Sequence, residues 1–187
     1  MNHTIADPIV ETGASVLLIG SEPSAVRAQF QSVLARDAAD ASVLLTTGNA
    51  CRSVDALVER GISRDALGVV DASGAPTIDS GLAEVEAVDG PGALSCLGIE
   101  ASGILERLAS RYEHVYVGVN CVTQLLDSQP VSVVFRFLHV LRRRVSTAGA
   151  VLVATIDRSA HEPDEVGVVE ALFDQVVDVD VPAERGC

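Results

Sequence analysis

One stretch of the chain has the residue order of a phosphate-binding turn. Ser15–Ile19 is apolar, Gly20 follows it, and a helical pattern begins near Pro23. In such a strand–turn–helix, backbone N–H groups surround a phosphate, and the lysine of the motif GxxxxGK[ST] reaches the outer phosphates. The chemistry of that arrangement is phosphoryl transfer, which requires specific residues within Ala14–Phe30.

The residues that hold a triphosphate are missing from this stretch. Counted from Gly20, the motif requires Gly, Lys and Ser or Thr where the chain has Ala25, Val26 and Arg27. All 13 basic residues are arginines, so no other register supplies the lysine. The absent second glycine hinders close approach of the backbone to a phosphate. Glu22 would also place a carboxylate beside the anion.

The strand–turn–helix keeps one property that needs no lysine. The N-terminus of a helix favours anions. Gly20, Ser21, Ser24 and Arg27 are therefore the candidate residues of a vestigial phosphate loop, which would bind ATP or another phosphate ligand weakly. The alternative is purely local: Ser21 or Ser24 caps the helix, and Pro23 occupies its first turn.

Other reactive residue types are present without the spacing that their chemistry needs. No GxSxG sequence marks a nucleophilic serine. The cysteines form no CxxC pair and the histidines have no partner at zinc spacing, so we expect no metal and no cofactor. We interpret the cysteines as buried small hydrophobes or free thiols. The histidines are His3, His114, His139 and His161, and the cysteines are Cys51, Cys96, Cys121 and Cys187.

Composition limits the partners. The chain has 187 residues, enough for one domain with a substantial core, and a formal charge of −13. Such an acidic surface repels nucleic acid. An acidic, lysine-free chain resembles proteins of salt-adapted archaea, so we expect it to be halophilic. With no signal peptide and no apolar run approaching the ~20 residues of a membrane span, we expect a cytoplasmic protein without membrane contact.

Apolar stretches alternate with helical patterns along the chain. Nearly continuous apolar strands between helices predict βαβ units, and hence a three-layer, doubly wound α/β fold with a mainly parallel sheet. The strand expected at residues 114–119 is the most central. The predicted strands are Ser15–Ile19, Ser42–Thr46, Leu67–Asp71, His114–Val119, Ala150–Thr155 and Val176–Val181. The predicted helices are Pro23–Asp37, Arg52–Gly61, Ile99–Tyr112, one capped by Ser128 that continues to Ser146, and Val166–Phe173.

Three stretches lie outside this alternation. Residues 72–95 are rich in Gly, Pro and acids, and we predict a long surface loop with a short edge strand near Leu82–Val88. Arg142, Arg143 and Arg144 form a basic cluster that complements a helix dipole, or else docks an acidic partner or a phosphate. Residues 157–187 carry nine acids and two arginines, which we interpret as a solvated acidic face.

The order of elements resembles the RecA/KaiC-like core of P-loop ATPases. Three sequences carry the resemblance: SVLLIGSEPS, SVLLTTGNA and above all HVYVGVNCVTQLL. In that family the last strand ends in the Walker B Asp, which orders Mg²⁺ and the attacking water. Asn120 occupies that vestigial Walker B position here, and Cys121 the Ser position. The stretches VVFRFLHVLRRRVSTAGAVLVATID and ALFDQVVDV resemble uncharacterised haloarchaeal KaiC-like proteins.

The resemblance implies one RecA/KaiC-like domain at residues 14–181. Residues 1–13 carry few apolar positions, so we expect a flexible tail there, and we expect a C-terminal tail at 182–187. Because lysine, the metal-binding hydroxyl and the acid are all replaced, we expect a pseudo-ATPase with no catalytic residues. The function expected is a non-catalytic regulatory or protein-interaction module, with a protein partner or self-association. The alternative is a nucleotide-responsive domain that binds a phosphate ligand at the Gly20 turn.

Overall fold

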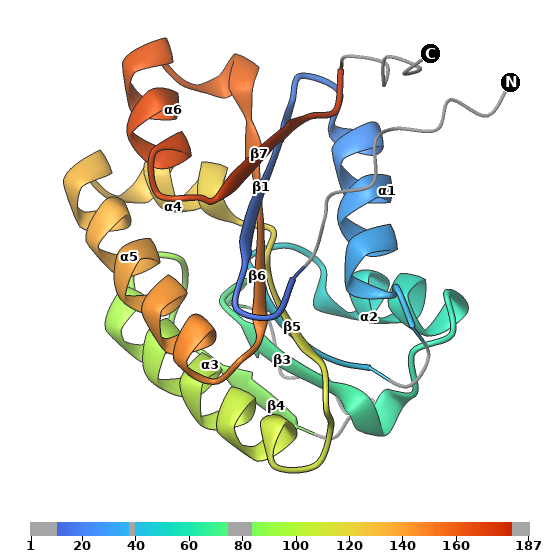
Figure 1. Cartoon of the computed structure of the whole chain (residues 1–187). Helices are drawn as coiled ribbons and strands as arrows, with labels where there is room; N and C mark the ends of the chain where they lie inside the picture. The colour runs from blue at the N-terminus through green and yellow to red at the C-terminus, as the bar shows by residue number, and fades with distance from the viewer. Residues whose placement is uncertain (1–10, 38–39, 75–83, 181–187) are drawn as a thin grey trace, which may run out of the picture.

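The computed structural model describes residues 11–37, 40–74 and 84–180 (Figure 1). Within these residues seven strands form one sheet in the order β4-β3-β2-β5-β6-β1-β7, and every neighbouring pair is parallel. Parallel neighbours require crossover connections. Helices supply the connections between consecutive strands, except from β3 to β4, where the chain passes through residues outside the described part. The strands are β1 (Ser15–Gly20), β2 (Ala41–Thr46), β3 (Leu67–Asp71), β4 (Glu84–Ala87), β5 (Val115–Val119), β6 (Val151–Asp157) and β7 (Gln175–Asp178).

Helices cover both faces of the sheet. α1 and α2 lie on one face, and α3, α4, α5 and α6 lie on the other (Figure 1). Every residue of β1, β2, β3 and β5 is buried, which explains why these strands are apolar throughout. The predicted three-layer parallel α/β fold is confirmed. The helices are α1 (Pro23–Leu34), α2 (Ala50–Glu59), α3 (Leu94–Ala109), α4 (Val122–Ser128), α5 (Val131–Thr147) and α6 (Pro163–Glu170), with 3₁₀ turns at Arg64–Ala66 and Arg158–Ala160.

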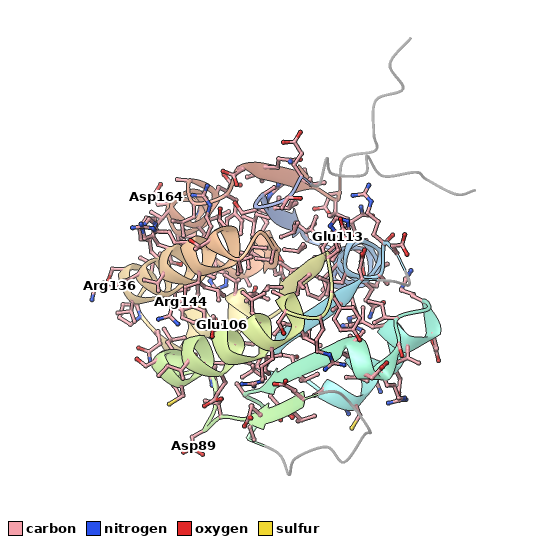
Figure 2. All side chains as sticks on the ribbon, turned by 60° about the horizontal axis from the view of Figure 1, so that its bottom comes forward. Asp89, Glu106, Glu113, Arg136, Arg144 and Asp164 are labelled. Atoms are coloured by element: carbon pink, nitrogen blue, oxygen red, sulfur yellow. The ribbon has the colours of Figure 1, made fainter. Side chains whose placement is uncertain are left out.

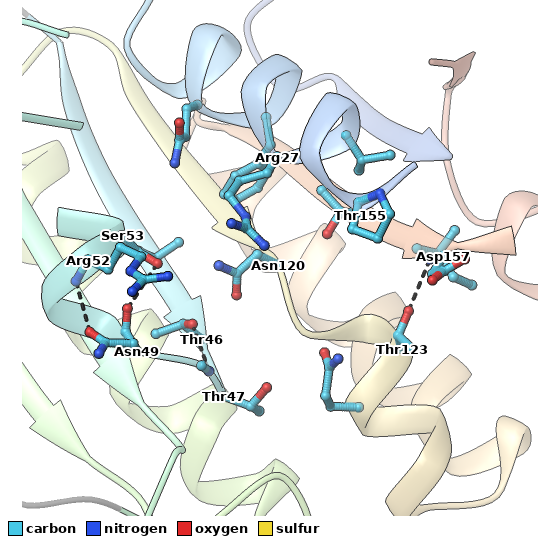
Figure 3. A pocket seen from close by; sticks show the side chains of 18 of the residues that line it. Arg27, Thr46, Thr47, Asn49, Arg52, Ser53, Asn120, Thr123, Thr155 and Asp157 are labelled. Carbon is cyan, nitrogen blue, oxygen red and sulfur yellow. Dashed lines mark hydrogen bonds between the residues drawn. The ribbon is translucent and has the colours of Figure 1, made fainter. Parts of the chain in front are cut away.

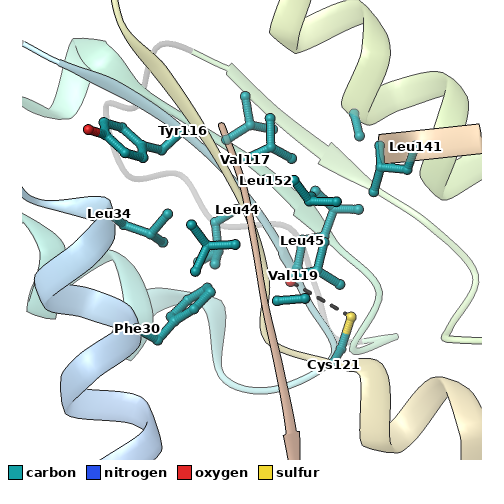
Figure 4. Packing of buried hydrophobic residues seen from close by; sticks show 14 of the residues in the cluster. Phe30, Leu34, Leu44, Leu45, Tyr116, Val117, Val119, Cys121, Leu141 and Leu152 are labelled. Atoms are coloured by element: carbon teal, nitrogen blue, oxygen red, sulfur yellow. Dashed lines mark hydrogen bonds between the residues drawn. The ribbon is translucent and has the colours of Figure 1, made fainter. Parts of the chain in front are cut away.

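The central strand, β5, is the one predicted from the sequence. It lies fourth of seven, between β2 and β6. Gly118 has no side chain, so Phe30 and Leu34 of α1 pack directly on the strand; a Cβ there would lie 2.6 Å from an atom of each. Figure 4 shows these two residues packed on Leu44, while Leu141 of α5 lies on the opposite side of the sheet. The core is therefore continuous through both layers.

The start of α1 differs from the prediction. Neither Ser21 nor Ser24 caps the helix, because the Glu22 side chain is the N-cap and accepts from the backbone N of Ser24. Pro23 occupies the first turn as predicted. The helix ends at Leu34 rather than Asp37, since the chain must turn towards β2. Its apolar face is buried as predicted.

Two further predicted helices are present but begin differently from the prediction. α3 begins at Leu94, inside the predicted loop, because the side chains of Leu94 and Leu97 on its first turns are buried in the core. Ser128 does not cap the long helix: it ends the unpredicted α4, its Oγ donates to the Gln124 carbonyl, and α5 begins after Pro130. α4 forms because Val122 and Leu125 are buried, and the helix packs against β6.

The remaining predictions concern the edges of the fold. β4 confirms the edge strand expected near residues 82–88, whereas residues 75–83 of the predicted loop lie outside the described residues. So do residues 1–10 of the predicted N-terminal tail, the whole predicted C-terminal tail, His3 and Cys187. No helix in the described part of the chain is both long and apolar enough to cross a membrane.

Candidate functional site

A cleft opens where the carboxyl ends of β1, β2, β5 and β6 meet. Its volume is about 460 Å³, and its walls come from α1 on one side and α2 on the other. In open parallel sheets, ligands bind in the crevice outside the carboxyl ends of the strands. We call this space the carboxyl-edge cleft; the polar residues on its wall include Arg27, Thr47, Asn49, Arg52, Asn120, Thr123 and Asp157 (Figure 3).

The turn after β1 is occupied by the chain's own carboxylates. The backbone N and Oγ of Ser21 donate to Asp180 Oδ2 at 2.7 and 2.8 Å. The backbone N and Oγ of Ser24 donate to Glu22 Oε1 at 3.3 and 2.8 Å. The Ser21 hydroxyl is also the main cause that lowers the pKa of Asp180 below its usual 3.8. N–H groups that could face a phosphate therefore already bind carboxylates.

Val26, where a phosphate-binding turn carries lysine, fills space beside this turn. It is buried, and its Cγ2 atom would lie 2.8 Å from a Cβ added at Gly20. The Asp180 carboxylate would lie 3.0 Å from the same point. Only a glycine fits there, and the reason is packing by the chain itself rather than access for a ligand.

Three of the five predicted site residues come together in the carboxyl-edge cleft. Gly20, Arg27 and Asn120 line it, and Figure 3 shows the Arg27 guanidinium beside the Asn120 side chain. Ser21 and Ser24 instead bond to Asp180 and Glu22, outside the cleft. Asn120 follows β5 directly, and its backbone N donates to the Leu45 carbonyl at 3.2 Å.

Cys121 is turned away from the cleft into the core. It is fully buried, and its thiol lies 3.8 Å from the Leu45 carbonyl. Burial raises the pKa of this thiol to about 12. Because the thiolate is the reactive form, Cys121 stays a protonated packing residue at neutral pH. Its interpretation as a buried small hydrophobe is confirmed, and Cys51 and Cys96 are exposed free thiols, the other part of that interpretation.

The cleft has a second cation, Arg52, which no sequence motif identifies. Arg52 lies on α2, across the cleft from Arg27 (Figure 3). Within the described residues, neither arginine has an ion-pair partner. The sequence feature that could have pointed to Arg52 is the turn after β2. There Asn49 caps α2 by accepting from the backbone N of Arg52 at 2.9 Å. A capping asparagine identifies the start of a helix, but it does not show that the Arg52 side chain faces a cleft.

Asp157 is the carboxylate that lines the cleft, and it is already engaged. Its Oδ1 accepts from the backbone N and Oγ of Ser159, at 2.9 and 2.6 Å. The backbone N of Asp157 donates to the Thr123 hydroxyl of α4 at 3.0 Å. With two guanidinium groups and several amide and hydroxyl groups, the cleft has the chemistry to bind an anion. In the described part of the chain, no group of three His, Cys, Asp or Glu side chains could hold a metal ion.

The basic cluster of α5 has specific contacts beyond the helix dipole. Arg142 donates from Nε to Ser15 Oγ at 3.0 Å and pairs with Asp174. Arg144 donates to Ser102 Oγ at 2.8 Å. Only Arg144 lies in the last helical turn, so the dipole interpretation is wrong for Arg142, which ties α5 to β1 and to the start of β7.

Comparisons with known proteins agree with the fold. Residues 13–179 match the family described as "Family of unknown function (DUF7504)", and the chain belongs to it. No curated protein matches the chain. A structure from Pyrococcus horikoshii OT3, described as a structural study of Project ID PH0250, is similar with a TM-score of 0.60 and 11% identity, covering 91% of this chain and 84% of that one. This likeness concerns the fold alone.

Proposed function

We propose that this member of DUF7504 is a non-catalytic RecA/KaiC-like domain that acts as a regulatory or protein-interaction module. One observation carries the proposal: Glu22 and Asp180 occupy the turn where an ATPase of this kind binds phosphate. A triphosphate would have to displace both carboxylates and overcome their charge. The kinship with RecA and KaiC rests on the resemblance described above.

The residues around the turn support the loss of phosphoryl transfer. That reaction depends on positioning and on neutralising phosphate charge. Val26 supplies no cation, and Asn120 supplies no charge to a metal ion. Each charge-stabilising contact in an active site is worth roughly 3–4 kcal/mol, so losing several together removes most of the rate enhancement.

ATP binding and hydrolysis by the purified chain test this proposal. We expect no ADP release, and no shift of the melting temperature when millimolar Mg-ATP is added in high salt. A ligand that binds the native state at comparable affinity would raise that temperature. ATP turnover that is abolished in Arg27→Gln or Asn120→Ala, but retained in Arg60→Gln, would contradict the proposal.

A second candidate function is binding of a phosphate-bearing ligand in the carboxyl-edge cleft, without turnover. The observation that favours it is the pair of arginines, Arg27 and Arg52, that face the cleft without carboxylate partners in the described residues. In a chain with 26 acids and 13 arginines, such a pair is a local excess of positive charge. Asn120 and Thr123 add uncharged hydrogen-bonding groups beside it.

Arginine variants separate the two candidates. If the cleft binds phosphate, inorganic phosphate or Mg-ATP raises the melting temperature of the wild type more than sodium chloride of equal ionic strength. Arg27→Gln and Arg52→Gln then lose that excess shift, while Arg60→Gln, an exposed arginine just beyond the same helix as Arg52, keeps it. Equal shifts in all four proteins would assign the effect to general screening and reject the ligand.

A further inference from the structure

The groove between α3 and α5 concentrates the exposed apolar surface of the domain. Five large hydrophobic side chains are exposed in the described residues, and three of them line this groove: Ile99 at 61%, Val133 at 37% and Val140 at 47%. Its volume is about 410 Å³, and Leu94 and Phe137 contribute to its floor and sides. We call it the α3–α5 groove. Scattered exposed hydrophobics need no explanation, but a cluster in a groove is typical of a binding surface.

The shape of the α3–α5 groove suits a helix. Along α5, Val133, Phe137, Val140 and Arg144 follow one another at three- or four-residue spacing, so they lie along one side of the helix. From Val133 to Arg144 this stripe is about 16 Å long, at roughly 1.5 Å per residue. That length matches three turns of a second helix laid in the groove, as in helix-in-groove recognition.

The charge of the groove is opposite to that of the rest of the molecule. Its charged lining residues are Arg136 and Arg144, both on α5, and no carboxylate lines it. Arg144 is anchored to Ser102 Oγ, and Arg136 is exposed without an ion pair in the described part of the chain. Figure 2 shows the two arginines on α5 and Glu106 on the neighbouring α3; no ion pair joins Glu106 to either of them. An apolar groove with a cationic rim therefore lies on a chain of charge −13.

We propose that the α3–α5 groove binds an amphipathic helix of an acidic partner protein. Apolar side chains of the partner, spaced three and four residues apart, enter the groove beside Ile99 and Val140. Asp or Glu side chains next to them face Arg136 and Arg144. This inference rests on the proposed interaction function and names the surface and the partner's chemistry.

The same charges argue against a second copy of the chain as the occupant. In a symmetric pair the same patch on both copies forms the interface. Arg136 and Arg144 of one copy would then meet a rim that also carries only arginines. An acidic helix, in contrast, neutralises the rim and covers the apolar side chains.

Synthetic peptides test the inference directly. The probe is a labelled amphipathic peptide with leucine at every third or fourth position, flanked by glutamates; its control has lysine in place of each glutamate. In fluorescence anisotropy we expect saturable binding of the acidic peptide and at least about tenfold weaker binding of the basic one, equivalent to about 1.4 kcal/mol. Raising the salt from about 0.1 to about 1 M weakens the acidic peptide's binding, because the Debye length falls from about 10 to about 3 Å.

Glutamate substitutions at three exposed positions locate the binding. Ile99→Glu and Arg136→Glu should each weaken binding of the acidic peptide by at least about tenfold. Val176→Glu, which introduces the same charged residue at another exposed apolar position, should leave it unchanged. All three positions are exposed, so the urea unfolding midpoints of the variants should equal that of the wild type, which excludes misfolding.

Several outcomes would overturn the inference. These are equal binding of both peptides, no binding of either, or equal losses in Ile99→Glu and Val176→Glu. Self-association in sedimentation that Ile99→Glu abolishes would assign the groove to a second copy instead. ATP turnover would refute the non-catalytic function while leaving the peptide result intact, so the two failures are distinguishable.

Discussion

Two aspartates hold the ends of β1. Asp174 accepts from the backbone N and Oγ of Ser15, at 2.9 and 2.7 Å, at the start of the strand. Asp180 makes the same pair of bonds to Ser21, just past its end. Both acids flank β7, so the segment 174–180 is hydrogen-bonded to both ends of β1. Their carboxylates therefore serve structure, in a region that the sequence presents only as an acidic face.

The contribution of Asp174 to stability depends on pH. The Ser15 hydroxyl, followed by the Ser15 N–H and Arg142, lowers its pKa below the usual 3.8. Because the native pKa is lower than the unfolded one, the stabilisation is complete above the unfolded value and is lost as pH falls through the native value. Asp174→Asn should lower the free energy of unfolding near pH 7 by up to about 1 kcal/mol, as for exposed pairs. In urea unfolding, the difference from the wild type should close below about pH 4.

The control for this measurement is Asp164→Asn, an exposed acid in the first turn of α6. This variant removes the same charge without touching the hydrogen bonds of Ser15, so the effect that belongs to those bonds is the difference between the two variants. A gap between Asp174→Asn and the wild type that widens as the solution is acidified would contradict the assigned hydrogen bonds.

Removing the carboxylate at Asp180 should expose the turn after β1 to anions. In Asp180→Asn, phosphate should raise the melting temperature more than it does in the wild type, at equal ionic strength, because the Ser21 N–H no longer faces a charged acceptor. Asp164→Asn also removes one negative charge, but the hydrogen bonds of Ser21 go to Asp180, so this variant should respond as the wild type does. Identical phosphate responses in all three proteins would show that Asp180 does not occupy an anion site.

At the scale of elements, close packing of helix on sheet depends on glycine. In Gly118→Ala the new Cβ lies 2.6 Å from Phe30 and Leu34, so α1 must move, and we expect a loss of about 1–3 kcal/mol. Gly167→Ala in α6 meets no atom within 4 Å and should stabilise the domain by about 0.5–1 kcal/mol, the helix preference for alanine. Denaturant unfolding of both variants checks the contrast. Equal effects would mean that α1 does not pack on β5 as described.

The sequence predicts a helix or strand well when its buried apolar residues recur at regular spacing along the chain. β3 was predicted at its observed bounds, and the apolar buried residues of α1 were predicted, although Gln29 is buried with them. α4 was missed because seven residues with only Val122 and Leu125 buried show no period. The start of α3 was missed because the Gly90–Gly92 turn signal stands directly before it, while the burial of Leu94 depends on tertiary packing.

The candidate site was only partly predictable, because it joins distant elements. Gly20 and Asn120 stand at the ends of recognisable strands, and Arg27 stands at a fixed motif spacing from Gly20, so the sequence identifies all three. Arg52 faces the same cleft only because β2 and β1 end at one edge of the sheet. The occupation of the turn by Asp180 depends on the pairing of β7 with β1, which no local pattern encodes.

At the scale of the whole molecule, the excess of acids predicts a salt response. With a charge of −13, mutual repulsion among carboxylates opposes the compact state. Sodium chloride shortens the Debye length to about 3 Å at 1 M and weakens that repulsion. The melting temperature should therefore rise between about 0.1 and about 1 M salt, despite some weakening of the surface ion pairs. A melting temperature that falls over this range would mean that the ion pairs outweigh the repulsion.

The position of β1 in the sheet has a consequence for synthesis on the ribosome. β1 emerges before both of its neighbours, β6 and β7, which lie more than a hundred residues later in the chain: Ser15 pairs with Leu152 and Val16 with Gln175. Until those strands emerge, the sequence SVLLI has no partner strands and is open to aggregation. Such long-range parallel pairing also slows folding. The sheet therefore covers β1 on both sides only after β6 and β7 have been synthesised.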